Sequence, residues 1–142
     1  MRALFDVNVL IALFQPDHIH HTRVHQWWEN NQHQGWASCP ITENGFVRII
    51  SQPKYPAPQT VLTAINLLNM AKVATDHEFW PDSLSILDQN SFAFTAASRH
   101  DQITDTYLLA LATKNDGCLV TLDQNIKAKH VMGATQKHLV SL

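Results

Sequence analysis

The feature that most constrains the fold is a short apolar run at residues 118–122 that ends at the carboxylate of Asp123. The run has no helical period, and such runs are typical of strands buried on both faces of a sheet. The N-terminus has the same form, because an apolar run at residues 3–5 ends at Asp6, and Asn8 follows two residues later. Parallel strands end at a common edge of an open sheet, where such sheets bind ligands. The two runs therefore predict that Asp6 and Asp123 share one edge.

Length and composition indicate one folded domain over residues 1–142. Hydrophobic residues make up 45% of the chain and charged residues 15%, which is too apolar for a disordered chain. The first residues lack the pattern of a signal peptide or a membrane span, so we expect no membrane partner and a cytoplasmic location. Cys39 and Cys118 are far apart and in no metal-ligand spacing, which indicates buried free thiols and not a disulfide.

The charge balance argues against a protein that binds nucleic acid through bulk positive charge. The formal net charge is -2, with 10 Lys and Arg against 12 Asp and Glu. Nonspecific binding to phosphates grows with the number of Lys and Arg contacts. Any nucleic-acid partner must therefore be held by local contacts or through a metal ion.

Apolar periodicity, capping residues and helix breakers predict an alternation of helices and strands. Asn8, Thr60 and Thr104 are expected to be the N-caps of three helices. The helices are predicted at residues 8–14, 18–34, 41–50, 61–72, 82–89 and 105–114. Besides the two runs above, strands are predicted at residues 36–39, 78–80 and 138–140, and one helical turn at 127–131. Residues 90–101 are compatible with a loop or an irregular helix. Strands separated by helices imply βαβ units, a central parallel sheet and a three-layer α/β/α fold.

Four acidic residues stand out by position. Asp6 and Asp123 follow strands, whereas Glu43 and Asp105 lie in the first turns of predicted helices. Two carboxylates about 4 Å apart repel by roughly 4 kcal/mol at an effective dielectric constant near 20, so a cluster of them requires a compensating charge. Oxygen ligands favour Mg²⁺ or Mn²⁺ over Zn²⁺. A cation of this kind activates water and steadies a phosphodiester, which makes metal-dependent phosphodiester hydrolysis the chemistry that the four acids favour.

Four segments of the chain resemble the PIN-domain ribonucleases and, among them, the VapC toxins of bacterial toxin-antitoxin systems. They are Leu4–Asn8, Thr42–Arg48, Ile103–Leu108 and Val120–Asp123, and they occur in the order found in that family. The resemblance covers the chain from end to end. It implies an α/β/α PIN-like fold with a parallel sheet. It also implies a Mg²⁺- or Mn²⁺-dependent endoribonuclease that cleaves structured RNA such as tRNA or rRNA, is neutralised by a cognate antitoxin and forms a homodimer.

The resemblance also assigns roles to residues. The catalytic acids that it implies are Asp6, Glu43, Asp105 and Asp123, with Asn8, Thr104, Thr121 and Asn125 as supporting polar residues. Asp6 and Asp105 are expected to hold the main ion, with Asp123 and Glu43 completing the cage or a weaker second site. Three basic residues are candidates for contact with RNA phosphates: Arg48, Arg99 and Lys127.

The four acidic residues also fit structural roles, which are the alternatives to a catalytic role. Asp6 and Asp123 are also suited to capping, and Glu43 and Asp105 are also suited to a solvated first turn of a helix. Asp101, close to Asp105, is interpreted as a loop acid. His21 and His25 lie one helical turn apart, but no third ligand accompanies them, so a solvated polar face is favoured over a zinc site. Trp27 and Trp28 are expected to pack in the core or at its rim.

Two other functions stay open at this point. One is a catalytically silent PIN-like module that only binds RNA or a protein partner. The other is a phosphatase that uses Asp6 as its nucleophile, since the sequence around Asp6 loosely resembles the opening motif of the haloacid dehalogenases. That family has a second Asp where this chain has Asn8.

Overall fold

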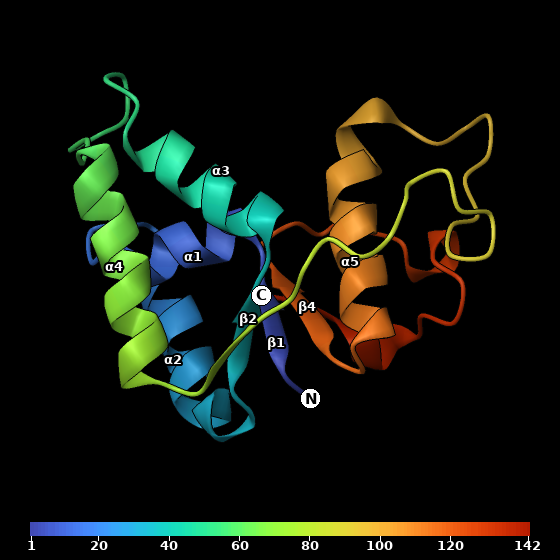
Figure 1. Ribbon diagram of the computed structural model, residues 1–142, viewed down its shortest axis with the longest axis horizontal. Coiled ribbons are helices and arrows are strands. Elements are labelled where there is room, and N and C mark those ends of the chain that lie inside the picture. Colours follow the sequence, from blue (N-terminus) through green and yellow to red (C-terminus); the bar gives the residue numbers. More distant parts are fainter.

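A five-stranded parallel sheet runs through the middle of the computed structural model, which describes all 142 residues (Figure 1). The strand order is β3-β2-β1-β4-β5, and every neighbouring pair is parallel. The two strands that deliver Asp6 and Asp123 are therefore adjacent in the centre of the sheet. The strands are β1 (Ala3–Phe5), β2 (Trp36–Ser38), β3 (His77–Phe79), β4 (Cys118–Thr121) and β5 (Leu139–Ser141).

Helices cover both faces of the sheet and complete three layers. In Figure 1, α1 to α4 lie on one side of the strands, and α5 lies on the other together with the long loop that precedes it. This arrangement confirms the predicted α/β/α fold. The helices are α1 (Val7–Phe14), α2 (His21–Asn31), α3 (Pro40–Ile50), α4 (Val61–Ala74) and α5 (Ile103–Lys114), with short 3-10 turns at Gln32–Gln34, His100–Gln102, Ala128–His130 and Gln136–His138.

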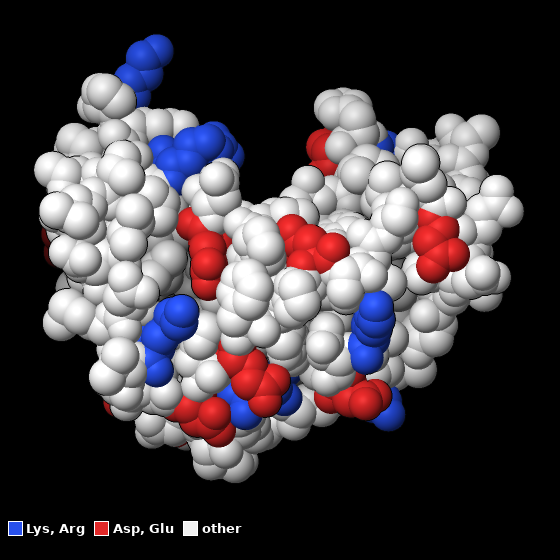
Figure 2. Space-filling view, viewed as in Figure 1, with Lys and Arg blue, Asp and Glu red and all other residues white.

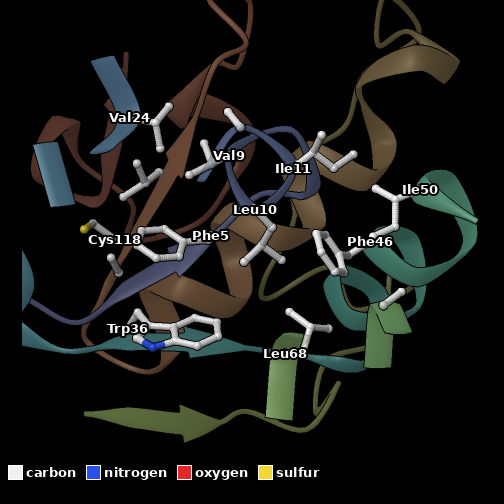
Figure 3. Close-up of a cluster of buried hydrophobic side chains, with 14 residues drawn as sticks. Phe5, Val9, Leu10, Ile11, Val24, Trp36, Phe46, Ile50, Leu68 and Cys118 are labelled. Carbon is white, nitrogen blue, oxygen red and sulfur yellow. The ribbon is translucent and has the colours of Figure 1, made fainter. Parts of the chain in front are cut away.

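Alternation along the central strands divides the core into two clusters. Phe5 and Val120 point into the cluster beneath α1 to α4, whereas Leu4 and Leu119 point into the cluster beneath α5. Figure 3 shows the first cluster, where the rings of Phe5 and Trp36 stack with centroids 5.6 Å apart. Because both faces of β1 and β4 are buried, their sequences are continuously apolar and do not alternate with polar residues.

Two predicted helix caps are wrong, because each helix begins before the expected cap. Asp6 is the N-cap of α1 and accepts a hydrogen bond from its first amide, while Asn8 lies inside the helix. A 3-10 turn at His100–Gln102 leads directly into α5, so Thr104 is the second helical residue and caps nothing. Thr60 caps α4 as predicted, through the amide of Thr63.

The helix predicted at residues 82–89 is also wrong, since this segment forms turns. Its short polar side chains bond to the local backbone instead. The amide of Leu87 donates to Oγ of Ser85, and the carboxylate of Asp88 accepts from the amide of Asn90 and the hydroxyl of Ser91. Side-chain bonds of this type offer the backbone an alternative to helical hydrogen bonds.

The remaining boundaries move by a few residues. The predicted helix at 18–34 divides into α2 and a 3-10 turn, and Gly35 follows with a positive φ of 73°. Residues 90–101 are mostly loop, held by a single antiparallel bridge between Phe92 and Val131. Cys39 and Cys118 are buried free thiols, as predicted. No helix has the length and hydropathy that crossing a membrane requires.

The close approach of Gly117 to β1 generates a stability prediction. A Cβ on Gly117 would lie 2.6 Å from the carbonyl oxygen of Arg2 and 2.5 Å from the ring of Trp80. Because the carbonyl is backbone and cannot move alone, Gly117→Ala should lower the free energy of unfolding by about 1–3 kcal/mol. Urea unfolding followed by circular dichroism measures the loss.

The neighbouring residue provides the control. Asp116 has a φ of 53°, so Asp116→Gly relieves a left-handed backbone while it adds freedom to the unfolded chain. Its free energy of unfolding should change by less than about 1 kcal/mol in either direction. Equal losses for the two variants would contradict the steric explanation.

Candidate active site

Asp6 lies at the carboxyl end of β1 with its side chain almost fully buried. The hydroxyl of Thr121 donates to Asp6 Oδ2 at 2.6 Å, and the amide of Val7 donates to Asp6 Oδ1 at 2.7 Å. Burial raises the pKa of Asp6 despite these hydrogen bonds, and the charge of Asp123 contributes to the rise. The capping role proposed as an alternative for Asp6 is therefore confirmed, and the same carboxylate also faces the other acids at this edge.

Asp105 is the acid most strongly perturbed by its surroundings. Burial is the largest cause, followed by the charge of Asp6 and a hydrogen bond with Asp123 that only a protonated Asp105 can donate. Together they raise the pKa of Asp105 to about 7. We refer to Asp6, Asp105 and Asp123 as the acid cluster, because each belongs to a different element and all three carboxyl groups act on one another electrostatically.

The backbone around Asp123 is held in place by the predicted supporting residues. Oδ1 of Asn8 accepts a hydrogen bond from the amide of Leu122 at 3.2 Å, which links α1 to the end of β4. Thr121 accepts from the amide of Asp123 while it donates to Asp6. The amide of Asn125 donates to Asp123 Oδ1 at 2.7 Å. These bonds orient the loop that carries Asp123, and the contact recorded for Asn125 is made by its backbone.

Glu43 lies apart from the acid cluster. It occupies the first turn of α3, and its Oε2 accepts a hydrogen bond of 2.5 Å from the hydroxyl of Ser38. It contributes to the raised pKa of neither Asp6 nor Asp105. Its side chain lines a hollow of about 350 Å³ between α3 and α4, which Lys72 also lines. The structure thus brings three of the four predicted acids together and places the fourth in a separate hydrogen-bonded group.

The acid cluster has the donor chemistry for a hard divalent cation. Three carboxyl groups supply only oxygen, the preferred ligand of Mg²⁺ and Mn²⁺. Burial and the charges of the other two acids raise the pKa of Asp105, and a bound cation would oppose both effects. No three acidic, His or Cys side chains converge on one point closely enough to form a finished coordination shell. The acid cluster therefore fits the cation by its chemistry and its place at the sheet edge.

Acidic side chains lie on the floor of a notch between the two sides of the molecule, and basic atoms lie over α3 on its wall (Figure 2). Arg48, in the last turn of α3, lines a hollow of about 480 Å³ together with Asn44, Asp82 and Thr104. This hollow also reaches Val7, the residue next to Asp6. Arg48 is thus the best placed of the three predicted phosphate contacts.

The other basic candidates differ from Arg48. Arg99 is exposed and forms a two-bond ion pair with Asp101, at 3.0 and 2.8 Å. This pair lowers the pKa of Asp101, consistent with a loop acid held by its own partner. Lys127 is exposed in the loop after β4. His21, considered above for zinc, is engaged with the carbonyl oxygen of Ala12 at 2.7 Å.

Sequence reasoning missed Ser38 and His77. Ser38 ends β2, so its place at the sheet edge could have been inferred from the predicted strand. His77 reaches Ser38 through the pairing of β3 with β2, and no local pattern indicates that register.

Comparison with known proteins finds one matching family and several similar ribonucleases. The family described as PIN domain matches residues 3–131. The chain is 51% identical to ribonuclease VapC44 of Mycobacterium tuberculosis over 142 residues, which is the whole of both chains. It is 41% identical to ribonuclease VapC39 of the same organism over 125 residues, 87% of this chain and 89% of that one. Ribonuclease VapC29 is 35% identical over 130 residues, 92% of both chains.

The raised pKa of Asp105 predicts how stability depends on pH when no metal is bound. Between the unfolded value near 3.8 and the folded value of about 7, the folded protein binds more protons than the unfolded chain. The contribution of Asp105 to the free energy of unfolding should therefore fall as the pH rises through this window. Asp105→Asn removes this contribution, so the variant should gain stability relative to wild type as the pH rises. The gain at about pH 8 should be about 1–2 kcal/mol, since water screens this partly buried carboxyl group.

Urea unfolding in EDTA at about pH 5 and pH 8 measures this difference. Asp17→Asn is the control, because Asp17 is exposed in the loop after α1. The lowered pKa of His77 affects wild type and variant alike, so the difference between the two proteins isolates Asp105. An Asp105→Asn variant that gains no stability relative to wild type between about pH 5 and pH 8 would contradict the prediction.

Proposed function

The chain belongs to the PIN domain family, and we propose that it is an endoribonuclease toxin of the VapC type that cleaves structured RNA with a divalent metal ion. The observation that carries the proposal is the acid cluster at the carboxyl edge of the sheet, where burial and the neighbouring Asp6 and Asp123 raise the pKa of Asp105 to about 7. Full-length identity of 51% to a protein named as a ribonuclease supports the same activity.

The acid cluster would hold Mg²⁺ or Mn²⁺, with Asp6 and Asp105 as the main ligands and Asp123 beside them. When bound, the ion supplies a water of lowered pKa and positive charge for the scissile phosphate. Thr121 and the amide of Val7 fix the orientation of Asp6, since each holds one of its oxygens. Asp105 would hold the ion in its ionised form, because ionised ligands are favoured next to a positive charge. Glu43 is the fourth acid and stands at the same edge on α3.

RNA is the substrate class that the surroundings of the cluster favour. The net charge of -2 provides little general attraction for phosphates, so binding depends on a few local contacts. Arg48 provides one of them on the wall of the hollow that reaches from α3 to Thr104. Arg99 and Lys127 are further candidates on the α5 and β4 sides. A structured RNA such as tRNA or rRNA would present a folded phosphate backbone to these separate positions.

We also propose a cognate antitoxin and a second copy of the chain as partners. An apolar hollow of about 220 Å³ lies between α1, α2 and α4, lined mainly by hydrophobic side chains that include Leu13 and Trp28. Val61, Leu62 and Val73 are exposed on α4. Exposed apolar surface of this extent is typical of protein interaction sites. Light scattering after gel filtration, with and without the protein encoded beside this gene, tests both partners.

The metal-dependent activity predicts the effect of Asp6→Asn. The side-chain oxygen of Asn can still accept from the amide of Val7, and its NH2 group can donate to Oγ of Thr121, so the fold is kept while the charge that holds the cation is lost. RNA cleavage should fall at least about 100-fold. The assay is incubation of purified protein with total tRNA and rRNA in Mn²⁺, with and without EDTA, and sequencing of the product ends. A water nucleophile should leave 5′-phosphate and 3′-hydroxyl ends.

The matched control for Asp6→Asn is Asp17→Asn, which should cleave as wild type does. Cleavage that survives EDTA, or an active Asp6→Asn variant, would overturn the metal mechanism. Binding of RNA without cleavage under all conditions would favour the catalytically silent PIN-like module instead.

The position of Arg48 predicts its contribution to RNA binding. Arg48→Gln removes one phosphate contact and should reduce the slope of log affinity against log salt by about 1. Fluorescence anisotropy in the inactive Asp6→Asn background measures this slope. Arg99→Gln should have a smaller effect, because Asp101 already neutralises Arg99. Arg23→Gln, on the exposed side of α2, is the control, and an equal effect of Arg23 and Arg48 would contradict a specific role for Arg48.

A further inference from the structure

Ser38 joins three elements at the edge of the sheet. It is the last residue of β2, and only 1% of it is exposed. Its Oγ lies 2.5 Å from Oε2 of Glu43 in α3 and 2.8 Å from Nε2 of His77 in β3. A buried hydroxyl is therefore placed between an acid of the predicted site and a histidine that the sequence did not single out.

The hydrogen atoms of this group can be assigned by counting donors and acceptors. An ionised Glu43 only accepts, so the single hydrogen of the Ser38 hydroxyl points to Oε2. The lone pairs of Ser38 Oγ then face His77, and Nε2 of His77 must carry a hydrogen. If the Ser38 hydroxyl donated to His77 instead, Oγ of Ser38 and Oε2 of Glu43 would lie 2.5 Å apart with no hydrogen between them. One chain of donation results, from His77 to Ser38 to Glu43.

The surroundings of His77 fix this arrangement. Its ring lies against Trp36, with centroids 4.4 Å apart, and Nε1 of Trp36 is itself bonded to the hydroxyl of Thr75 at 2.8 Å. Burial lowers the pKa of His77 to about 4, and the charges of Lys72 and Arg2 act in the same direction. The ring is thus neutral near pH 7 and has a single hydrogen, which the donor count places on Nε2.

We propose that Ser38 and His77 are positioning residues for Glu43, which hold its carboxylate at the carboxyl edge of the sheet through the chain of donation from Nε2 of His77. Without them the Glu43 side chain is free to turn into the hollow that it shares with Lys72, the nearest free cation among its lining residues. The inference rests on the proposed function only for the claim that the position of Glu43 affects RNA cleavage. The hydrogen-bond chain itself follows from the fold.

The tautomer of His77 tests the chain independently of activity. Long-range ¹H–¹⁵N correlation spectra distinguish Nε2–H from Nδ1–H in a neutral imidazole. The wild-type spectrum should show Nε2–H for His77, and its shift should change in Ser38→Ala and in Glu43→Gln. An Nδ1–H tautomer in the wild type, or a His77 signal that does not respond to either substitution, overturns the proposal.

Kinetics with matched variants test the consequence for cleavage. Gln keeps an N–H donor near the position of Nε2, whereas Met has similar size and no donor. His77→Met and Ser38→Ala should lower kcat at least about tenfold with KM changed less than about threefold, as expected for residues that orient an acid. His77→Gln and Ser38→Thr should recover most of the loss. The control, His33→Gln, changes an exposed histidine before β2 and should leave kcat unchanged.

The His77 tautomer and the kcat values together distinguish failure of the hydrogen-bond chain from failure of the proposed function. Equal kcat values for His77→Gln and His77→Met, with unfolding midpoints like that of wild type, overturn the positioning role. If His77→Gln or His77→Met is destabilised, the same comparison of kcat is made between Ser38→Thr and Ser38→Ala, and equal values again overturn the positioning role. A wild-type protein that cleaves no RNA contradicts the proposed function. The tautomer measurement then still supports or overturns the hydrogen-bond chain.

Discussion

The parallel pairing of β1 with β4 is the constraint on which the site depends. It sets Phe5 opposite Val120, so the residues that follow, Asp6 and Thr121, meet at the same edge of the sheet. Burial on both faces of these strands constrains the register, since a shift by one residue would exchange side chains between two core clusters that are packed around different residues. The acids are thus brought together by hydrophobic packing, and their repulsion is a cost that the core offsets. The raised pKa of Asp105 reflects that cost together with burial of its carboxyl group.

Sequence reasoning could predict what depends on apolar pattern. The continuous apolar runs at β1 and β4 predicted two buried strands, and the helices between them predicted a parallel sheet with three layers. The edge shared by Asp6 and Asp123 followed directly. What the pattern could not predict was the direction of side chains after the strands end. Glu43 was expected among the other acids, but it is bonded to the hydroxyl of Ser38, to which His77 of β3 also bonds.

The errors in local structure have a common cause. Caps and short helices are decided by single hydrogen bonds, and several partners compete for each. Asp6 is a better cap than Asn8 once the strand fixes its backbone, and a 3-10 turn starts α5 before Thr104 is reached. In the segment that follows Trp80, the Ser and Asp side chains bond to nearby amides and so prevent the helix that composition favours. Each outcome depends on about 1 kcal/mol, which a pattern of residue types does not resolve.

The central position of β4 also determines when the protein becomes able to act during its own synthesis. β1 is made first and can pair with β2, but its other neighbour in the sheet, β4, is more than 110 residues away in the chain, and β5 follows only at residues 139–141. The first half can form helices on the ribosome, yet Asp6 has no Thr121 and no Asp123 beside it until nearly the whole polypeptide has emerged. The residues proposed to hold the cation therefore come together only after almost all of the chain has left the ribosome, which makes the proposed site a late product of folding.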